Sequence, residues 1–377
     1  MKLLYVASDQ KVPGRTGGSV HVEEVARGLS ARGHEVHVVA RAGDEFTNEF
    51  TIHPNPAVIQ HRFFRWTARR KVDLIIEELG VDAVMERYYN FGGEGVRAAF
   101  DRNLPVLVEV NAPLREHPGS AKTKLDKLLL FHPMARLRDE ICRKASAVVT
   151  PLPSILPENL PPEKIHQVNW GANVEMFQPE TPRAVLPIPE DCPIIVFSGS
   201  FRPWHGADVL VRASVHVPEA CFLFVGDGPS NSACRNLARK LGVEKRVFFT
   251  GAVPYRQMPS YLKWASIGVA PYQPSRLGQM KLGFFWSPLK IFEYMAMGLP
   301  VVTLDVDPLR EIVGEQGGRL VSEGNPEKLA AAIQVLLTNS DLASAMGRAA
   351  RERVVREYSW QQHCQLLERI LLEMTAR

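Results

Sequence analysis

Short apolar segments alternate with helical patterns along this chain, and the alternation runs twice. In the first half the apolar segments are LLYVAS, EVHVVA, AVMERY, VLVEV and AVVTP, which have the length and composition of strands. The alternation restarts with PIIVFSGS and continues through CFLFVGDG, RVFFTG, SIGVAPY and LPVVTLDV, followed by helical patterns to the end. Strands that alternate with helices form right-handed βαβ units, so each half predicts a doubly wound α/β domain with a parallel sheet.

A proline-rich stretch separates the two halves. Residues 178–193, QPETPRAVLPIPEDCP, contain five prolines and no periodicity, which is typical of a linker. A chain of 377 residues is also long for a single hydrophobic core. We therefore expect an N-terminal domain over 1–178 and a C-terminal domain over 190–357. Ligands of such sheets bind beyond the carboxyl ends of the strands, so we expect a site in a cleft between the domains.

Composition excludes several classes of protein. The chain is 45% hydrophobic and 23% charged, as in ordinary soluble globular proteins, and no apolar run has the length of a membrane span. Asp9 interrupts the first apolar run, which predicts a strand in place of a signal peptide and a cytoplasmic protein. The five scattered cysteines predict reduced thiols, and a net charge of +4 is too small to indicate nucleic acid as a partner.

Two loops that follow strands are candidates for phosphate binding. Gly17 and Gly18 precede a helix expected to begin near Ser19, where backbone amides and the helix dipole favour an anion. The second domain opens with GSFRPWHGADVL, in which Arg202 can bind phosphate through two hydrogen bonds. His205 in the same loop can donate a hydrogen bond and become charged beside a dianion. The alternative for this loop is a turn with a solvated arginine and a packed tryptophan.

Residues 284–300, FFWSPLKIFEYMAMGLP, contain one glutamate in an apolar run. Ser287 is a good N-cap and Pro288 suits the first helical position, which predicts a helix up to Gly298. Lys290 and Glu293 then lie one turn apart on the same face. The apolar neighbours favour a buried helix over a surface ion pair. We expect the first amides, of Leu289 and Lys290, to face a phosphate and the carboxylate to accept hydrogen bonds from a ribose.

The motifs together resemble the group 1 (family 4) retaining glycosyltransferases of the GT-B fold, in the right order along nearly the entire chain. The matching segments are GGSVHVEEVARGLSARGHEVHVV, EKIHQVNWGANVEMFQP, FLFVGDGP, VFFTGAVPYRQMPSYLKWASIGVAPY, SPLKIFEYMAMGLPVV, GGRLV and YSW. The resemblance implies two Rossmann-like domains, a nucleotide-sugar donor held mainly by the second, and a C-terminal helix over 358–377 that returns to the first.

This sequence departs from the family pattern at several positions. Glu293 matches the second acid of the family's E-x7-E motif, which binds ribose, but the first position holds Phe285. The family's arginine and lysine that face the diphosphate are replaced by Ser200 and His205. Arg202 and Lys290 are the candidates to take over that charge. The family's histidine in the first domain corresponds to Asn111, which can position a hydroxyl but cannot transfer a proton.

The candidate site residues fall into three sets. The candidate catalytic residues are Arg202, His205, Lys290 and Glu293. The candidate donor-binding residues are Gly17, Gly18, Ser200, Gly226, Asp227, Gly251, Phe285, Ser287 and Leu289. The candidate acceptor-binding residues are His21, Asn111, Arg115 and His117.

The resemblance implies transfer of a hexosyl group from a nucleoside diphosphate sugar to a hydroxyl with retention, the leaving phosphate helping to deprotonate the acceptor. Side chains and helix ends are expected to neutralise the diphosphate, so no metal or other cofactor is expected. The pair Asp305 and Asp307 forms a D-x-D pattern, which we interpret as an ordinary loop. A nucleotide-sugar epimerase, a phosphorylase and a noncatalytic nucleotide-sugar-binding protein remain as alternatives with the same architecture.

Two basic and apolar segments concern the acceptor. Residues 61–71, HRFFRWTARRK, contain five lysines or arginines and no acid, and residues 121–138 add more. Such segments can lie on an anionic membrane surface, and the alternative is a solvated basic helix face. The first reading predicts a lipid-linked acceptor, as in surface polysaccharide or glycolipid synthesis, and peripheral contact with the inner face of the membrane. The second predicts a soluble small-molecule acceptor.

Overall fold

A computed structural model describes residues 1–14, 16–43, 48–55, 68–88, 92–114, 121–128, 132–285 and 287–376. The chain forms two compact units. The first comprises Met1–Trp170, Phe285–Ser287 and Trp360–Arg377, and the second comprises Gly171–Phe284 and Pro288–Ser359. The proline-rich stretch belongs to the second unit, where the backbone N–H of Ala184 donates to the Ser260 carbonyl at 3.0 Å.

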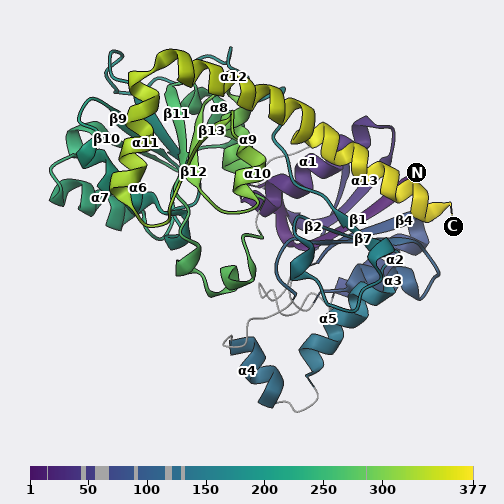
Figure 1. The fold of residues 1–377 in the computed structure, drawn as a ribbon. Helices are drawn as coiled ribbons and strands as arrows, with labels where there is room; N and C mark the ends of the chain where they lie inside the picture. The colour runs from purple at the N-terminus through teal and green to yellow at the C-terminus, as the bar shows by residue number, and fades with distance from the viewer. Residues whose placement is uncertain are drawn as a thin grey trace. The chain divides into compact units, whose positions relative to one another are not determined.

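The first unit is a seven-stranded parallel sheet in the order β3-β2-β1-β4-β5-β6-β7, with helices on its faces (Figure 1). Its strands are β1 (Lys2–Val12), β2 (Glu35–Ala42), β3 (Thr51–Pro54), β4 (Ala83–Tyr88), β5 (Val106–Val110), β6 (Ala147–Thr150) and β7 (Ile165–Gln167). Its helices are α1 (Gly17–Ala31), α2 (Arg69–Leu79), α3 (Glu94–Phe100), α4 (Ala121–Leu128), α5 (Pro133–Lys144) and α13 (Trp360–Thr375).

The second unit is a six-stranded parallel sheet in the order β10-β9-β8-β11-β12-β13. Its strands are β8 (Ile194–Ser198), β9 (Cys221–Val225), β10 (Val247–Gly251), β11 (Ala265–Ala270), β12 (Val301–Leu304) and β13 (Gly318–Val321). Its helices are α6 (Ala207–Ala213), α7 (Asn231–Lys240), α8 (Met258–Leu262), α9 (Leu289–Ala296), α10 (Leu309–Val313), α11 (Pro326–Thr338) and α12 (Ser340–Glu357).

The prediction of two doubly wound α/β domains is confirmed. In each sheet the order reverses beside the first strand, between β1 and β4 and between β8 and β11, and ligands of open α/β sheets bind at such a switch point. Three short strands were not expected: β3, β7 and β13 each have three or four residues at a sheet edge. The first strand also continues to Val12, through residues that were expected to form a loop.

Close packing under the switch point of the second unit depends on Tyr294 of α9. A Cβ atom at Gly268 of β11 would lie 2.5 Å from the Tyr294 ring, so only glycine allows the helix to lie this close to the strand. The buried Tyr294 hydroxyl accepts hydrogen bonds from the Ser198 backbone N–H at 2.7 Å and from the Ser198 hydroxyl at 3.1 Å. Helix α9 is thereby fixed against the carboxyl end of β8.

All five cysteines are free, and Cys142, Cys221, Cys234 and Cys364 are buried. Within the described parts of the chain no single helix is both long and apolar enough to cross a membrane. The bent pair α11 and α12 passes that test only on combined length and composition.

We predict that Tyr294→Phe destabilises the second unit by about 1–3 kcal/mol, because it leaves the buried Ser198 N–H without an acceptor. The measurement is urea unfolding of the full chain. Tyr261→Phe is the matched control, since the Tyr261 hydroxyl bonds to none of the described residues, and its effect should stay within about 0.5 kcal/mol. Equal stabilities of the two variants would show that the hydroxyl does not hold α9.

Candidate active site

Three glycine-containing strand ends meet in the second unit. The Gly199 N–H donates to the Val225 carbonyl at 2.9 Å, and the Gly226 N–H donates to the Gly251 carbonyl at 3.0 Å. A Cβ atom at Gly226, which has a φ of +120°, would lie 2.2 Å from the Gly199 carbonyl oxygen. Glycine at 226 therefore lets the loops after β8 and β9 touch. The predicted donor-binding residues Gly226 and Gly251 are brought together here.

Lys290 lies beside this loop with its side chain buried, 7% exposed. A Cβ atom at Gly199 would lie 3.1 Å from its Nζ and 4.0 Å from His205 Nδ1, so these groups surround the same backbone position. The ammonium lies 4.1 Å from the Phe197 ring centroid and 5.3 Å from that of Tyr272, and no described group accepts a hydrogen bond from it. Burial lowers the Lys290 pKa to about 7, although Glu293 opposes the shift.

His205 is neutral in this structure. Burial, together with the charges of Lys290 and Arg202, lowers its pKa to about 2 against an opposing hydrogen bond with the Ser200 backbone. The expectation that this imidazole becomes charged beside a dianion stays a prediction, since this low pKa applies to the protein without a bound anion. Neutral imidazole still has one N–H with which to donate a hydrogen bond.

The other polar groups of this loop are exposed. Ser200 and Arg202 both face solvent, and the Arg202 guanidinium lies 5.9 Å from the Trp204 ring centroid. This arrangement matches the alternative of a solvated arginine beside a packed tryptophan. Asp227 is also exposed, and its carboxylate accepts from the Gly228 N–H at 2.7 Å.

Glu293 is buried on α9, 6% exposed, so the surface-pair interpretation is excluded. Burial raises its pKa to about 7, while a hydrogen bond with Tyr255 and the charge of Lys290 lower it. Tyr255 begins a short 3-10 helix, Tyr255–Gln257, that follows β10. Sequence reasoning missed this tyrosine because nothing in the local pattern distinguishes it.

The predicted start of α9 is wrong by one residue. The helix begins at Leu289, preceded by Pro288, and no side chain caps it. The Ser287 hydroxyl instead accepts from the Trp170 N–H at 2.8 Å. Phe285 and Ser287 belong to the first unit, and Phe285 is 1% exposed.

The glycine pair of the first unit lies inside α1 and not ahead of it. The helix begins at Gly17, and Thr16 is the N-cap, its side chain accepting from the Ser19 N–H at 3.3 Å. A Cβ atom at Gly18 would lie 2.4 Å from the Gln10 side chain and 3.1 Å from that of Arg87. The small residue at 18 therefore accommodates the protein's own side chains.

Two of the four predicted acceptor-binding residues are described. His21 is buried, 1% exposed, and Asn111 accepts from the Trp170 indole N–H at 3.1 Å through Oδ1. Arg115 and His117 lie outside the described residues.

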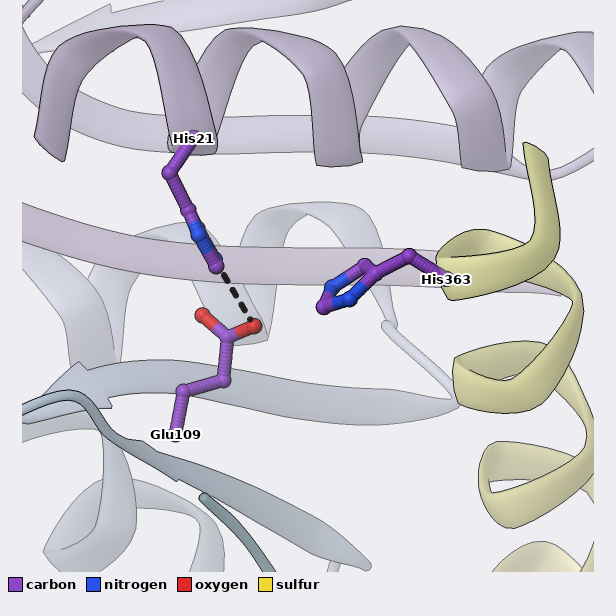
Figure 2. Close-up of side chains that lie close together, drawn as sticks. All are labelled: His21, Glu109 and His363. Atoms are coloured by element: carbon purple, nitrogen blue, oxygen red, sulfur yellow. Dashed lines mark hydrogen bonds and ion pairs between the residues drawn. The ribbon is translucent and has the colours of Figure 1, made fainter. Parts of the chain in front are cut away.

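Sequence reasoning missed a buried polar cluster around His21 (Figure 2). Its Nε2 lies 3.2 Å from Glu109 Oε1, and the other Glu109 oxygen accepts from the Tyr5 hydroxyl. Burial raises the Glu109 pKa to about 7, although Tyr5 and Arg87 lower it. His363 reaches the same place from α13. The signal that could have found the cluster is the single charged residue in the strand VLVEV.

The D-x-D pattern forms local ion pairs. Arg310 donates to Asp305 at 2.9 Å and to Asp307 at 3.2 Å, and all three side chains are exposed. Both carboxylates thus bind one arginine in the first turn of the helix that follows their loop.

Comparisons with known proteins agree with this architecture. The family described as Glycosyltransferase Family 4 matches residues 15–175, and the family described as Glycosyl transferases group 1 matches residues 192–339. A D-inositol 3-phosphate glycosyltransferase from Xylanimonas cellulosilytica is 25% identical over 407 residues, which covers 98% of this chain and 94% of the relative.

Solved structures extend the likeness over both units. Sucrose-phosphate synthase from Thermosynechococcus elongatus has a TM-score of 0.76 and 19% identity, covering 100% of this chain and 99% of its own. Anabaena HepE in complex with UDP has a TM-score of 0.74 and 16% identity, covering 99% of this chain and 100% of its own. The fold is thus GT-B, with two Rossmann-like domains, and the chain belongs to the group 1 glycosyltransferases of family 4 and is a transferase.

Proposed function

We propose that this glycosyltransferase binds a nucleoside diphosphate sugar on the second unit and transfers its hexosyl group with retention. The observation that carries the proposal is the buried Lys290 ammonium, which has no acceptor among the described residues and lies beside Gly199. A buried cation without a protein partner is costly. An anionic ligand at the carboxyl end of β8 would offset that cost.

Each polar group of this site has a part in the proposed chemistry. Lys290 would neutralise charge on the departing diphosphate, and the neutral His205 would donate a hydrogen bond to it. Arg202 is exposed and has the length to turn toward a phosphate. Glu293 would accept hydrogen bonds from ribose hydroxyls, with Tyr255 holding its carboxylate. These side chains supply the charge that a metal ion supplies elsewhere, so the transfer step needs no metal.

The described residues suggest no covalent nucleophile for the transfer. The proposed step therefore places the acceptor hydroxyl on the same face as the leaving diphosphate. The bond from the anomeric carbon to the diphosphate oxygen breaks, a bond to the acceptor oxygen forms, and the leaving phosphate takes the acceptor proton. Neither Asn111 nor the buried His21 is needed as a base in this scheme.

We propose a lipid-linked acceptor. The relative from Xylanimonas is named for a phosphorylated inositol, which favours the soluble alternative, whereas the surface of this chain favours a lipid. In this chain α4 exposes Leu125 by 50% and Leu128 by 77%, next to the exposed Lys124. A helix that exposes leucines beside lysine suits an anionic lipid surface. Of the basic stretch 61–71, residues 61–67 lie outside the described residues, and Arg69 forms ion pairs with Asp73 and Asp101.

Glu293→Gln should remove the preference for a ribose over a deoxyribose. We expect wild type to bind UDP about 10- to 100-fold more tightly than 2′-deoxy-UDP, because a hydrogen bond to a carboxylate contributes about 1.5–3 kcal/mol. Calorimetric titration of both nucleotides measures the ratio. In Glu293→Gln the ratio should fall toward one, with slower hydrolysis of the donor, and Glu315→Gln, an exposed control, should keep it. A ratio unchanged in Glu293→Gln would remove the ribose role.

Donor affinity should be greatest near pH 7. Free Lys290 has a pKa of about 7, and a bound diphosphate stabilises its charged form. Binding therefore takes up a proton above pH 7, and affinity should fall as the pH rises, by up to about tenfold per unit. Glu293, also near 7, must be ionised to accept from hydroxyls, so affinity should fall below pH 7 as well.

The variants assign the two limbs of this profile. The affinity is measured for UDP-glucose or GDP-mannose, whichever binds, at a series of pH values around 7. The diphosphates of these donors do not change their protonation in this pH range. Lys290→Arg should flatten the alkaline limb, since arginine stays charged, and Glu293→Gln should flatten the acid limb. An alkaline limb that persists in Lys290→Arg would mean that another group binds the diphosphate.

Leu125→Glu/Leu128→Glu should weaken sedimentation with vesicles of anionic phospholipid at low salt. The two carboxylates would lie on the face that we expect to enter the headgroup region, where charge is unfavourable. Leu372→Glu, at a leucine with the same 50% exposure on α13, is the control and should sediment like wild type. No binding by wild type at low salt would favour a soluble acceptor, and the transfer reaction would then be tested with inositol phosphates.

A further inference from the structure

Three side chains from distant parts of the first unit converge at one buried point. His21 comes from α1, Glu109 from β5 and His363 from α13, and Figure 2 shows the His363 ring pointing into the space beside the other two. One potential ligand atom of each lies within 4.8 Å of the others. The three residues are 1%, 1% and 4% exposed.

The hydrogen bonds orient one imidazole as a ligand. His363 Nδ1 lies 2.8 Å from the Asn169 carbonyl oxygen, an acceptor only, so Nδ1 carries the proton and Nε2 has a free lone pair. No described group donates to that Nε2. Buried polar atoms are nearly always partnered, and a backbone carbonyl behind the ring is the arrangement that fixes a metal-binding histidine.

The carboxylate is held in a matching way. Tyr5 donates to Glu109 Oε2, which leaves Oε1 toward His21 Nε2 at 3.2 Å. Tetrahedral zinc with bonds of about 2.0–2.2 Å separates its ligand atoms by about 3.4 Å. The His21–Glu109 distance of 3.2 Å is close to this separation, and His363 would have to approach by up to about 1.4 Å.

Aromatic rings lie beside the cluster, and the charge of Arg87 lowers the Glu109 pKa. The Trp170 ring lies 4.4 Å from His21, and the Trp360 ring lies 5.2 Å from His363, between ring centroids. Arg87 is paired with Asp9 at 3.2 Å. Two imidazoles and a carboxylate are the ligands that zinc and similar first-row divalent ions take in proteins, with a fourth position for water.

We propose that His21, Glu109 and His363 bind one divalent first-row metal ion, with zinc as the favoured ion, that links α1, β5 and α13 within the first unit. The ion is structural, and none of its three ligands is a residue assigned to the donor. The proposal therefore does not depend on the proposed function.

Metal content of the full-length protein tests the site directly. Protein without an affinity tag is produced in zinc-supplemented medium and treated with EDTA to remove loosely bound metal. Its zinc content is then measured by inductively coupled plasma mass spectrometry. We expect about one zinc ion per chain. Protein stripped under mild denaturation should have a lower melting temperature, regained with Zn²⁺, because a ligand bound only by the folded state raises stability. Co²⁺ in its place should give the visible absorption of a tetrahedral site.

Matched variants separate this site from the other histidines of the first unit. His363→Asn keeps an N–H near the position of Nδ1 and removes Nε2, so the zinc content should fall well below one ion per chain. Added Zn²⁺ should then no longer raise the melting temperature of this variant. His37→Asn/His53→Asn changes a histidine pair elsewhere in the first unit, with ring nitrogens 3.0 Å apart, and should retain the metal. If His363→Asn does not fold, Glu109→Gln replaces it. Wild type without zinc, or variants with undiminished zinc, would overturn the proposal and leave a hydrogen-bonded cluster only.

Discussion

The second unit buries the Lys290 ammonium, and none of the described residues accepts a hydrogen bond from it. Aromatic rings of Phe197 and Tyr272 lie close to it, and they partly replace the lost hydration through cation–π attraction. Gly199 has no side chain to occupy the position beside the ammonium, where a Cβ atom would lie 3.1 Å from Lys290 Nζ. A fold shaped only for stability would favour an apolar residue at this position. The burial of this charge beside the end of β8 is therefore best explained by a ligand.

The same charge explains how the site departs from the family pattern. An arginine and a lysine in the loop after the first strand of the second domain would place two cations at the positions of Ser200 and His205. Here the buried cation comes from α9, and burial together with the charge of this cation keeps the His205 pKa low. The two residues are thus coupled, because a charged side chain at 205 would lie next to Lys290 in a region of low dielectric. Lys290 lies on a helix whose position Tyr294 fixes.

The sequence predicted the fold well because buried parallel strands are continuous apolar runs. VLVEV, IIVFS and CFLFV are buried along their whole length, and each could be recognised as a strand from the local sequence alone. The edge strands Thr51–Pro54 and Gly318–Val321 are too short for a pattern and form only because a neighbouring strand offers hydrogen bonds. Ser287 has the right residue type for an N-cap, yet its hydroxyl bonds to Trp170, a residue more than a hundred positions away in sequence. Local rules fail where a distant group competes for the same atom.

Candidate site residues could be named from residue types, but their protonation could not. Glu109 and Glu293 belong to different units, and burial raises the pKa of each to about 7. Their partners differ: Glu109 meets a tyrosine and an uncharged histidine, whereas Glu293 meets a tyrosine and a lysine. The positive charge that acts on Glu109, that of Arg87, is already paired with Asp9, whereas Glu293 has Lys290 on its own helix. That difference follows from tertiary packing alone, and it is why a cation is sought beside Glu109 and an anion beside Lys290.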